Sequence, residues 1–235
     1  TMLTTLSFPY GRTTLNCRLE ADELKAVLTS SLEDYQAALS EEDLVRKALE
    51  NPIGCPRLAQ LSAGKKNITV ITSDHTRPMP SRITMPLLLS EIRKGSPEAR
   101  ISILVATGTH RAATREELLE RFGDEIVSQE KIYIHNCDDA SSMTILGGTP
   151  GGNTIAINRL AAEADLLIAE GFIEPHFFAG FSGGRKSIMP GIASRGSIMY
   201  NHCAPWIADP HSVMGSLEHN PIHEDMVFAA RKSGL

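Results

Sequence analysis

Two features common in secreted and membrane proteins are missing from this sequence. The four cysteines, Cys17, Cys55, Cys137 and Cys203, lie far apart and form no C-x-x-C pair. No secretory leader opens the chain, and its longest apolar runs are too short to span a bilayer. These absences indicate a cytoplasmic protein whose thiols are free.

Positive charge is also scarce. The 23 Lys and Arg residues are outnumbered by 28 Asp and Glu, which gives a net charge of −5. Without a long basic run, the chain is a poor candidate for nucleic acid or for an anionic membrane surface. The 235 residues contain neither internal repeats nor a low-complexity tract, and a hydrophobic fraction of 42% is ordinary for a globular protein. We therefore expect one large domain over residues 1–235.

Short apolar runs alternate with amphipathic stretches along most of the chain. Residues 3–19 predict a two-stranded edge element with a turn at Gly11, and Ser40 is placed to begin a helix. Helical patterns follow over 83–92, after Thr114 and around 160–164. Strands are predicted at 68–71, 101–106, 132–135, 155–157 and 166–169. This alternation predicts an α/β, Rossmann-like, doubly wound, mostly parallel sheet with helices on both faces.

Polar segments follow three of the predicted strands. They begin at Asp74, at Thr107 and at Glu170. Open parallel sheets bind ligands outside the carboxyl ends of their strands, so these segments are expected to share one crevice. Within the first segment, Arg77 suits a substrate carboxylate, although an Asp74–Arg77 pair that braces the loop is equally compatible with the pattern.

A glycine-rich segment, residues 180–187, precedes and includes Lys186. Its small residues allow close approach of a ligand, so Ser182, Gly183, Gly184 and Arg185 are candidate contacts for a phosphate. The segment nearly matches a P-loop, but Arg185 stands where the second glycine is required. A nucleotide-binding phosphotransferase is therefore an alternative.

Histidines supply the candidate acid–base groups. His110 and His176 each end a strand segment and are able to serve as two bases on opposite faces of one carbon, as a racemase requires. His202 is a candidate lone metal ligand, and Cys203 beside it is a weaker one. His219 and His223 have metal-like spacing, but Pro221 between them argues against a shared helical face.

Together these motifs resemble the nickel-pincer lactate racemase family. The matching segments, in order over more than half the chain, are Ser73–Pro78, Gly108–Arg111, Glu174–His176, Gly183–Lys186 and Asn201–His202. The resemblance implies a racemase of a small 2-hydroxy acid. It also implies a nickel pincer nucleotide, a pyridinium-3,5-bisthiocarboxylic acid mononucleotide, covalently attached to Lys186 and made by dedicated maturation proteins.

The same resemblance assigns roles to the site residues. His202 is the single protein ligand to nickel, and His110 and His176 alternate as acid and base while the α-hydrogen moves as hydride. Arg77 orients the substrate carboxylate, and Asp74 helps to hold the site. Family members continue into a second domain, so we expect residues 1–235 alone to be weakly active or inactive. A non-catalytic domain that binds a nucleotide or a partner is the remaining alternative.

Overall fold

The computed structural model describes residues 3–235, which divide into two compact units. The first unit ends at Ser40 and contains β1 (Leu3–Tyr10), β2 (Thr13–Glu20) and the 3-10 helix η1 (Ser31–Asp34). Strands β1 and β2 pair antiparallel around a turn at Gly11, as predicted. They form a two-stranded sheet of their own.

The second unit, Glu41–Leu235, is built on a four-stranded parallel sheet. Its strands are β3 (Asn67–Ser73), β4 (Arg100–Ala106), β5 (Lys131–Ile134) and β8 (Leu166–Ala169). Their order is β5-β4-β3-β8, so the chain builds outward from β3 and then returns to its other side. The predicted α/β fold with a parallel sheet is confirmed. Ligands of such sheets bind where the strand order reverses, here beyond the carboxyl ends of β3 and β8.

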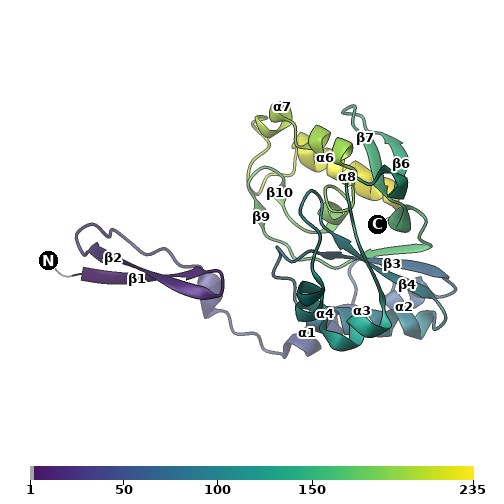
Figure 1. Ribbon diagram of the computed structural model, residues 1–235, viewed down its shortest axis with the longest axis horizontal. Helices are drawn as coiled ribbons and strands as arrows, with labels where there is room; N and C mark the ends of the chain where they lie inside the picture. Colours follow the sequence, from purple (N-terminus) through teal and green to yellow (C-terminus); the bar gives the residue numbers. More distant parts are fainter. Residues whose placement is uncertain (1–2) are drawn as a thin grey trace. The chain divides into compact units, whose positions relative to one another are not determined.

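Helices cover one face of this sheet. They are α1 (Glu41–Glu50), α2 (Leu58–Ser62), α3 (Ser81–Gly95) and α4 (Arg115–Gln129) (Figure 1). Alternate strand residues such as Val70 and Ile103 pack here against Met85 of α3 and Phe122 of α4. Thr114 begins α4 with the predicted capping box: its hydroxyl accepts from the Glu117 amide, and the Glu117 carboxylate accepts from the Thr114 amide.

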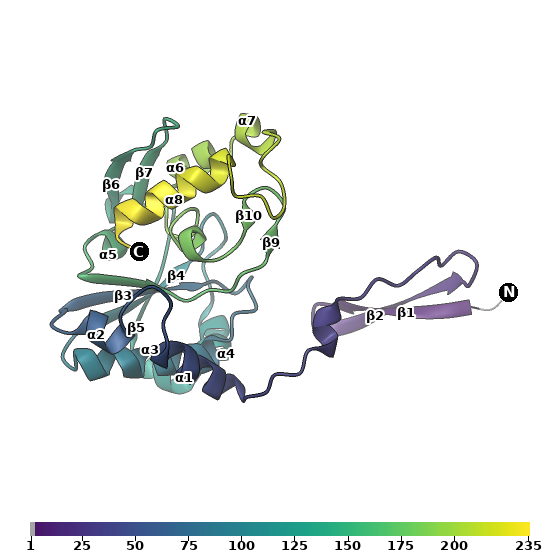
Figure 2. The ribbon, with the colours of Figure 1, turned by 180° about the vertical axis from the view of Figure 1, so that it is seen from behind.

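The opposite face carries the C-terminal half of the chain (Figure 2). Ile71 and Leu104 point to this side and pack with Ile198 of α6 and Met226 of α8. The elements are η2 (Ala140–Ser142), β6 (Met143–Gly148), β7 (Thr154–Asn158), α5 (Arg159–Ala162), β9 (Pro175–His176), β10 (Gly180–Phe181), η3 (Gly184–Ser187), α6 (Arg195–Asn201), α7 (Ala204–Ile207) and α8 (Pro221–Ser233). Helices thus lie on both faces, as the sequence predicts.

One predicted strand lies outside the parallel sheet. Residues 155–157 belong to β7, which pairs antiparallel with β6 around a glycine-rich turn. Two glycines in β6 weaken its apolar pattern, so the sequence predicts β7 but not the strand that pairs with it. All four cysteines are free, as predicted, and no helix formed by residues 3–235 is long and apolar enough to cross a membrane.

Candidate active site

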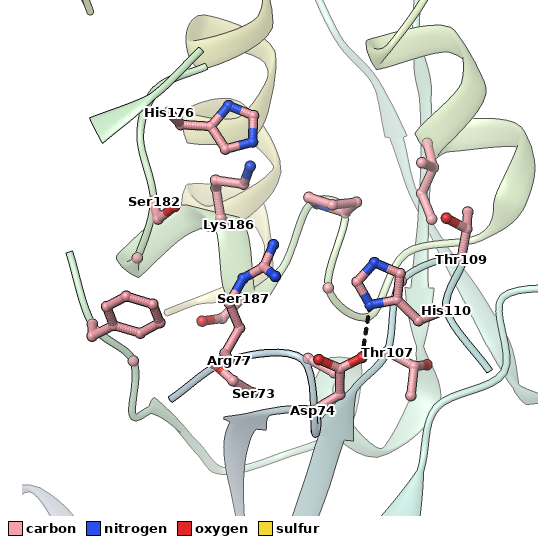
Figure 3. A pocket seen from close by; sticks show the side chains of 18 of the residues that line it. Ser73, Asp74, Arg77, Thr107, Thr109, His110, His176, Ser182, Lys186 and Ser187 are labelled. Carbon is pink, nitrogen blue, oxygen red and sulfur yellow. Dashed lines mark hydrogen bonds and ion pairs between the residues drawn. The ribbon is translucent and has the colours of Figure 1, made fainter. Parts of the chain in front are cut away.

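A cavity of about 290 Å³ lies beyond the carboxyl ends of β3, β4 and β8. Eight of the ten predicted site residues line it, namely Asp74, Arg77, His110, His176, Ser182, Gly183, Lys186 and His202. In the view of Figure 3, His176 and Lys186 lie on one side, Asp74 and His110 on the other, and Arg77 between them. The crevice expected from the strand ends is therefore present.

Asp74 and His110 form a hydrogen-bonded pair across adjacent strands. His110 Nδ1 lies 2.7 Å from Asp74 Oδ2, while Asp74 Oδ1 accepts from the Thr76 amide at 3.1 Å and its hydroxyl at 2.6 Å. Burial alone would raise the pKa of Asp74, but these hydrogen bonds and the charge of His110 together lower it. An acceptor-only carboxylate fixes the proton of neutral His110 on Nδ1, which leaves Nε2 as a free base.

His176 is held in the opposite tautomer to His110. Its Nδ1 accepts from the backbone amides of Ala179 at 3.2 Å and Phe178 at 3.4 Å, so the neutral ring carries its proton on Nε2. Burial, followed by the positive charges of Lys186 and neighbouring groups, lowers the pKa of His176 to about 4. His176 lies on the short β9–β10 hairpin rather than directly at the end of a parallel strand. The two neutral rings thus carry their proton on different nitrogens, Nδ1 in His110 and Nε2 in His176.

Arg77 lines the cavity close to its own loop. Its Nη1 lies 3.2 Å from Thr76 Oγ1, and within residues 3–235 no ion pair joins it to Asp74, which contacts His110 instead. The loop-bracing Asp74–Arg77 pair that the sequence left open is therefore not formed. A guanidinium beside two imidazoles is suited to a two-point contact with a carboxylate.

Lys186 sits on η3, two residues after Gly184; Gly183 and Gly184 have φ values of +81° and +51°. A Cβ on Gly183 would lie 3.0 Å from the carbonyl oxygen of Phe172, so this position requires glycine. Only a four-residue 3-10 helix follows the glycines, whereas a P-loop leads into an α-helix. The geometry therefore does not favour the phosphotransferase alternative.

The amine of Lys186 is expected to react at an unusually low pH. Burial, and then the charges of Arg185 and Arg77, lower its pKa to about 8. A neutral amine is the nucleophilic form, so acylation of Lys186 should reach half its maximal rate near pH 8. Acylation of a short unstructured lysine peptide should still rise steeply there, since an unperturbed lysine titrates near about 10.4. Peptide mass spectrometry after timed acetylation measures both; identical pH profiles would contradict the expectation.

Arg185 and Gly184, also predicted to bind the cofactor, do not line the cavity. The Arg185 guanidinium donates to the carbonyls of Phe181 and Ala179, each at 2.7 Å, and its Nε donates to His223 Nδ1 at 3.0 Å. Arg185 thus holds the glycine-rich segment in a compact turn and joins it to α8. Its predicted contact with a cofactor stays a prediction.

His202 follows α6 and faces the cavity with its ring edge-to-face against Phe178, at 5.2 Å between centroids. Its Nδ1 is buried and has no hydrogen-bond partner. Burial, then the charge of Lys186, lowers its pKa to about 4, so the ring is neutral and able to donate a lone pair.

No other predicted metal ligand joins His202. Cys203 is not among the residues that line the cavity, and His219 precedes α8, which Asn220 caps. Across residues 3–235, no three His, Cys, Asp or Glu side chains cluster to hold a metal ion. A metal at His202 would need most of its ligands from another molecule.

Two residues behind the cavity have no role assigned to them by the sequence pattern. Glu170 is a buried carboxylate directly after β8, and Arg121 lies on α4 with hydrogen bonds to the Asp74–Arg77 loop. The sequence places Glu170 at a strand end beside the expected crevice, but that position alone assigns it no role. Nothing in the pattern of α4 distinguishes Arg121 from a surface arginine.

The sequence and the fold both match known racemases. The model of the lactate racemase N-terminal domain family matches residues 10–215. The lactate racemase of Thermoanaerobacterium thermosaccharolyticum is 53% identical over 230 residues, covering 98% of this chain and 54% of that protein. The lactate racemase of Lactiplantibacillus plantarum is 50% identical over 230 residues, again covering 98% and 54%.

A solved structure matches as well. The lactate racemase apoprotein from T. thermosaccharolyticum superposes with a TM-score of 0.87 at 51% identity, covering 99% of this chain and 54% of that one. The chain thus spans about half the length of these relatives. Since the family model covers most of the chain, the cavity and its histidines are those of a member of the lactate racemase N-terminal domain family, to which this chain belongs.

Proposed function

We propose that this chain is the catalytic part of a lactate-racemase-like enzyme that inverts a small 2-hydroxy acid. The observation that carries the proposal is the pair of histidines held in opposite tautomers on two sides of one cavity. Inversion of a carbon centre needs a proton acceptor for one face and a proton donor for the other. The names of the 53% and 50% identical relatives support lactate as the substrate.

His110 and Asp74 would act as the oriented base. The Nε2 atom of His110 takes the hydroxyl proton of the substrate, and the Asp74 carboxylate, 2.7 Å from Nδ1, stabilises the imidazolium that results. Arg77 holds the substrate carboxylate, which keeps the hydroxyl within reach of the base.

His176 would act as the complementary acid. The imidazolium form of His176 would return a proton to the substrate oxygen on the opposite face and become the neutral ring, while the amides of Phe178 and Ala179 orient that ring. Reaction of the other enantiomer requires the opposite protonation states, so the two histidines exchange roles between directions.

The residues present also fit a nickel pincer nucleotide. Lys186 has a lowered pKa that favours the neutral amine needed for a covalent tether, and His202 offers a buried imidazole with an unpartnered nitrogen. Ser182 and Gly183 line the cavity beside Lys186, where they would contact the nucleotide. When bound, this cofactor supplies the acceptor and donor for the α-hydrogen as hydride. Maturation proteins that build it are the expected partners.

The proposal is tested by intact mass and nickel content of protein co-expressed with cofactor-maturation proteins. The wild-type chain should carry a mass increment and nickel, and Lys186→Ala should lose both. Lys131→Ala, an exposed lysine outside the cavity, is the matched control and should keep both. An unmodified wild-type mass without nickel, beside a correctly matured relative in the same cells, would refute the tether. ATP should not raise the melting temperature, as it would for a phosphotransferase.

A further inference from the structure

Behind the cavity, a buried network joins four elements at the point where the strand order reverses. Its centre is Glu170, which is 6% exposed and directly follows β8. Three hydroxyl groups donate to its carboxylate at 2.5 Å: those of Thr72 at the end of β3, and Ser81 and Thr84 in the first turn of α3. A carboxylate accepts only, so these three donors satisfy most of its lone pairs, and two of them, Ser81 and Thr84, lie at a helix N-terminus, where negative charge is favoured.

Arg121 connects this network to the catalytic loop. Its Nη2 donates to the carbonyl oxygens of Asp74 at 2.5 Å and Arg77 at 2.7 Å. Its Nη1 lies 3.5 Å from Ser81 Oγ, the same hydroxyl that donates to Glu170. One partly buried guanidinium thus fixes the backbone at both ends of the Asp74–Arg77 segment, and Glu170 balances its charge.

We propose that Arg121 and Glu170 are positioning residues for the proposed racemase, which set the place of Asp74 and Arg77 without touching substrate. The planar fork of an arginine is able to hold two carbonyls in fixed directions, which a lysine ammonium cannot do. When the fork is lost, the loop carbonyls lose their partners, and the Asp74 carboxylate no longer stays within 2.7 Å of His110.

Arg82 provides a matched control. It lies on α3 and also donates to two backbone carbonyls, those of Leu119 at 3.1 Å and Glu120 at 3.2 Å, but it does not touch the 74–77 loop. Loss of Arg82 therefore removes a comparable set of arginine–carbonyl hydrogen bonds on α4 and leaves the loop untouched.

The test compares Arg121→Met, Arg121→Lys and Arg82→Met by amide hydrogen exchange and by imidazole ¹⁵N spectra of the cofactor-free chain. In Arg121→Met, exchange at the Thr76 and Arg77 amides should rise by about tenfold or more, and His110 should lose its fixed Nδ1–H form. In Arg121→Lys, amide exchange in the loop should be faster than in the wild type but slower than in Arg121→Met. In Arg82→Met, both exchange and the His110 spectrum should match the wild type. Unchanged exchange and an unchanged His110 spectrum in Arg121→Met would overturn the proposal.

Activity gives a second, separable readout. In loaded enzyme, Arg121→Met should lower kcat about 10- to 100-fold and raise KM, because both the base and the carboxylate-binding Arg77 are displaced. If Arg121→Met does not fold, Glu170→Gln replaces it, with loop exchange again as the readout. The exchange and NMR measurements need no cofactor, so they stand even where the racemase proposal fails, and that failure would show instead as absent turnover in the wild type.

Discussion

Asp74→Asn should lower the racemisation rate of the loaded enzyme by about 10³- to 10⁴-fold, the scale seen when the orienting carboxylate of a catalytic histidine is made an amide. Thr76 donates twice to Oδ1 of Asp74, at 3.1 and 2.6 Å, so the amide oxygen of an asparagine takes that position. The NH₂ group then faces His110 Nδ1 and forces the proton to Nε2. The substitution thus preserves the loop and reverses the tautomer.

The measurement is turnover from each enantiomer, together with the imidazole ¹⁵N spectrum of His110. Asp138→Asn is the control, because Asp138 contacts Arg195 on the surface and lies outside the cavity. A rate within tenfold of wild type in Asp74→Asn would show that His110 does not depend on the carboxylate.

His176→Gln should lower racemisation by about 10²- to 10⁴-fold in both directions, the usual contribution of a positioned acid–base group. The side-chain oxygen of glutamine is able to accept the hydrogen bonds from the Phe178 and Ala179 amides in place of Nδ1. It cannot, however, exchange a proton with the substrate. His211→Gln is the matched control: His211 pairs with Asp209 on the surface, outside the cavity. Equal losses in the two variants would remove His176 from the mechanism.

The same variant has a predictable effect on acid stability. The pKa of His176 is about 4 in the folded chain, against an ordinary value of 6.5. Between these two values the unfolded state binds more protons, so the free energy of unfolding falls as the pH drops from 6.5 toward 4. His176→Gln removes this contribution. Denaturant midpoints at pH 7 and pH 5 should therefore differ less in His176→Gln than in wild type or in His211→Gln.

Much of this site could be predicted because strand ends are visible in sequence. The buried run at 101–106 ends β4, and the polar residues after β3 and β4 reach one edge because parallel strands share a direction. Spacing alone could not give the contacts that decide the chemistry. Neither the backbone amides that fix His176 nor the reach of Arg121 from α4 to the Asp74 loop follows from local pattern. The Arg121 contact depends on packing between segments far apart in the chain, whereas the His176 contacts form within one short hairpin whose turn the sequence pattern does not reveal.

Arg185 illustrates the same limit from the other side. In sequence it stands in a glycine-rich segment beside Lys186 and has the charge to bind phosphate. In the fold, the carbonyls of Ala179 and Phe181 and the ring of His223 use its donors. Composition identifies a group that is able to bind an anion, but only packing shows which of its donors are already bonded within the protein.

The hydrogen bonds that hold His110 and His176 in the cavity come from separate stretches of chain. His110 bonds to Asp74, and these two residues follow the two strands of one βαβ unit. His176 bonds instead to backbone amides of its own hairpin. Because they share none of these partners, the bias on each proton should vary independently, and changes at Asp74 and at the 176–179 turn should combine additively in a double-mutant cycle on tautomer populations. Evolution could thus adjust the proton affinity of one histidine without resetting that of the other.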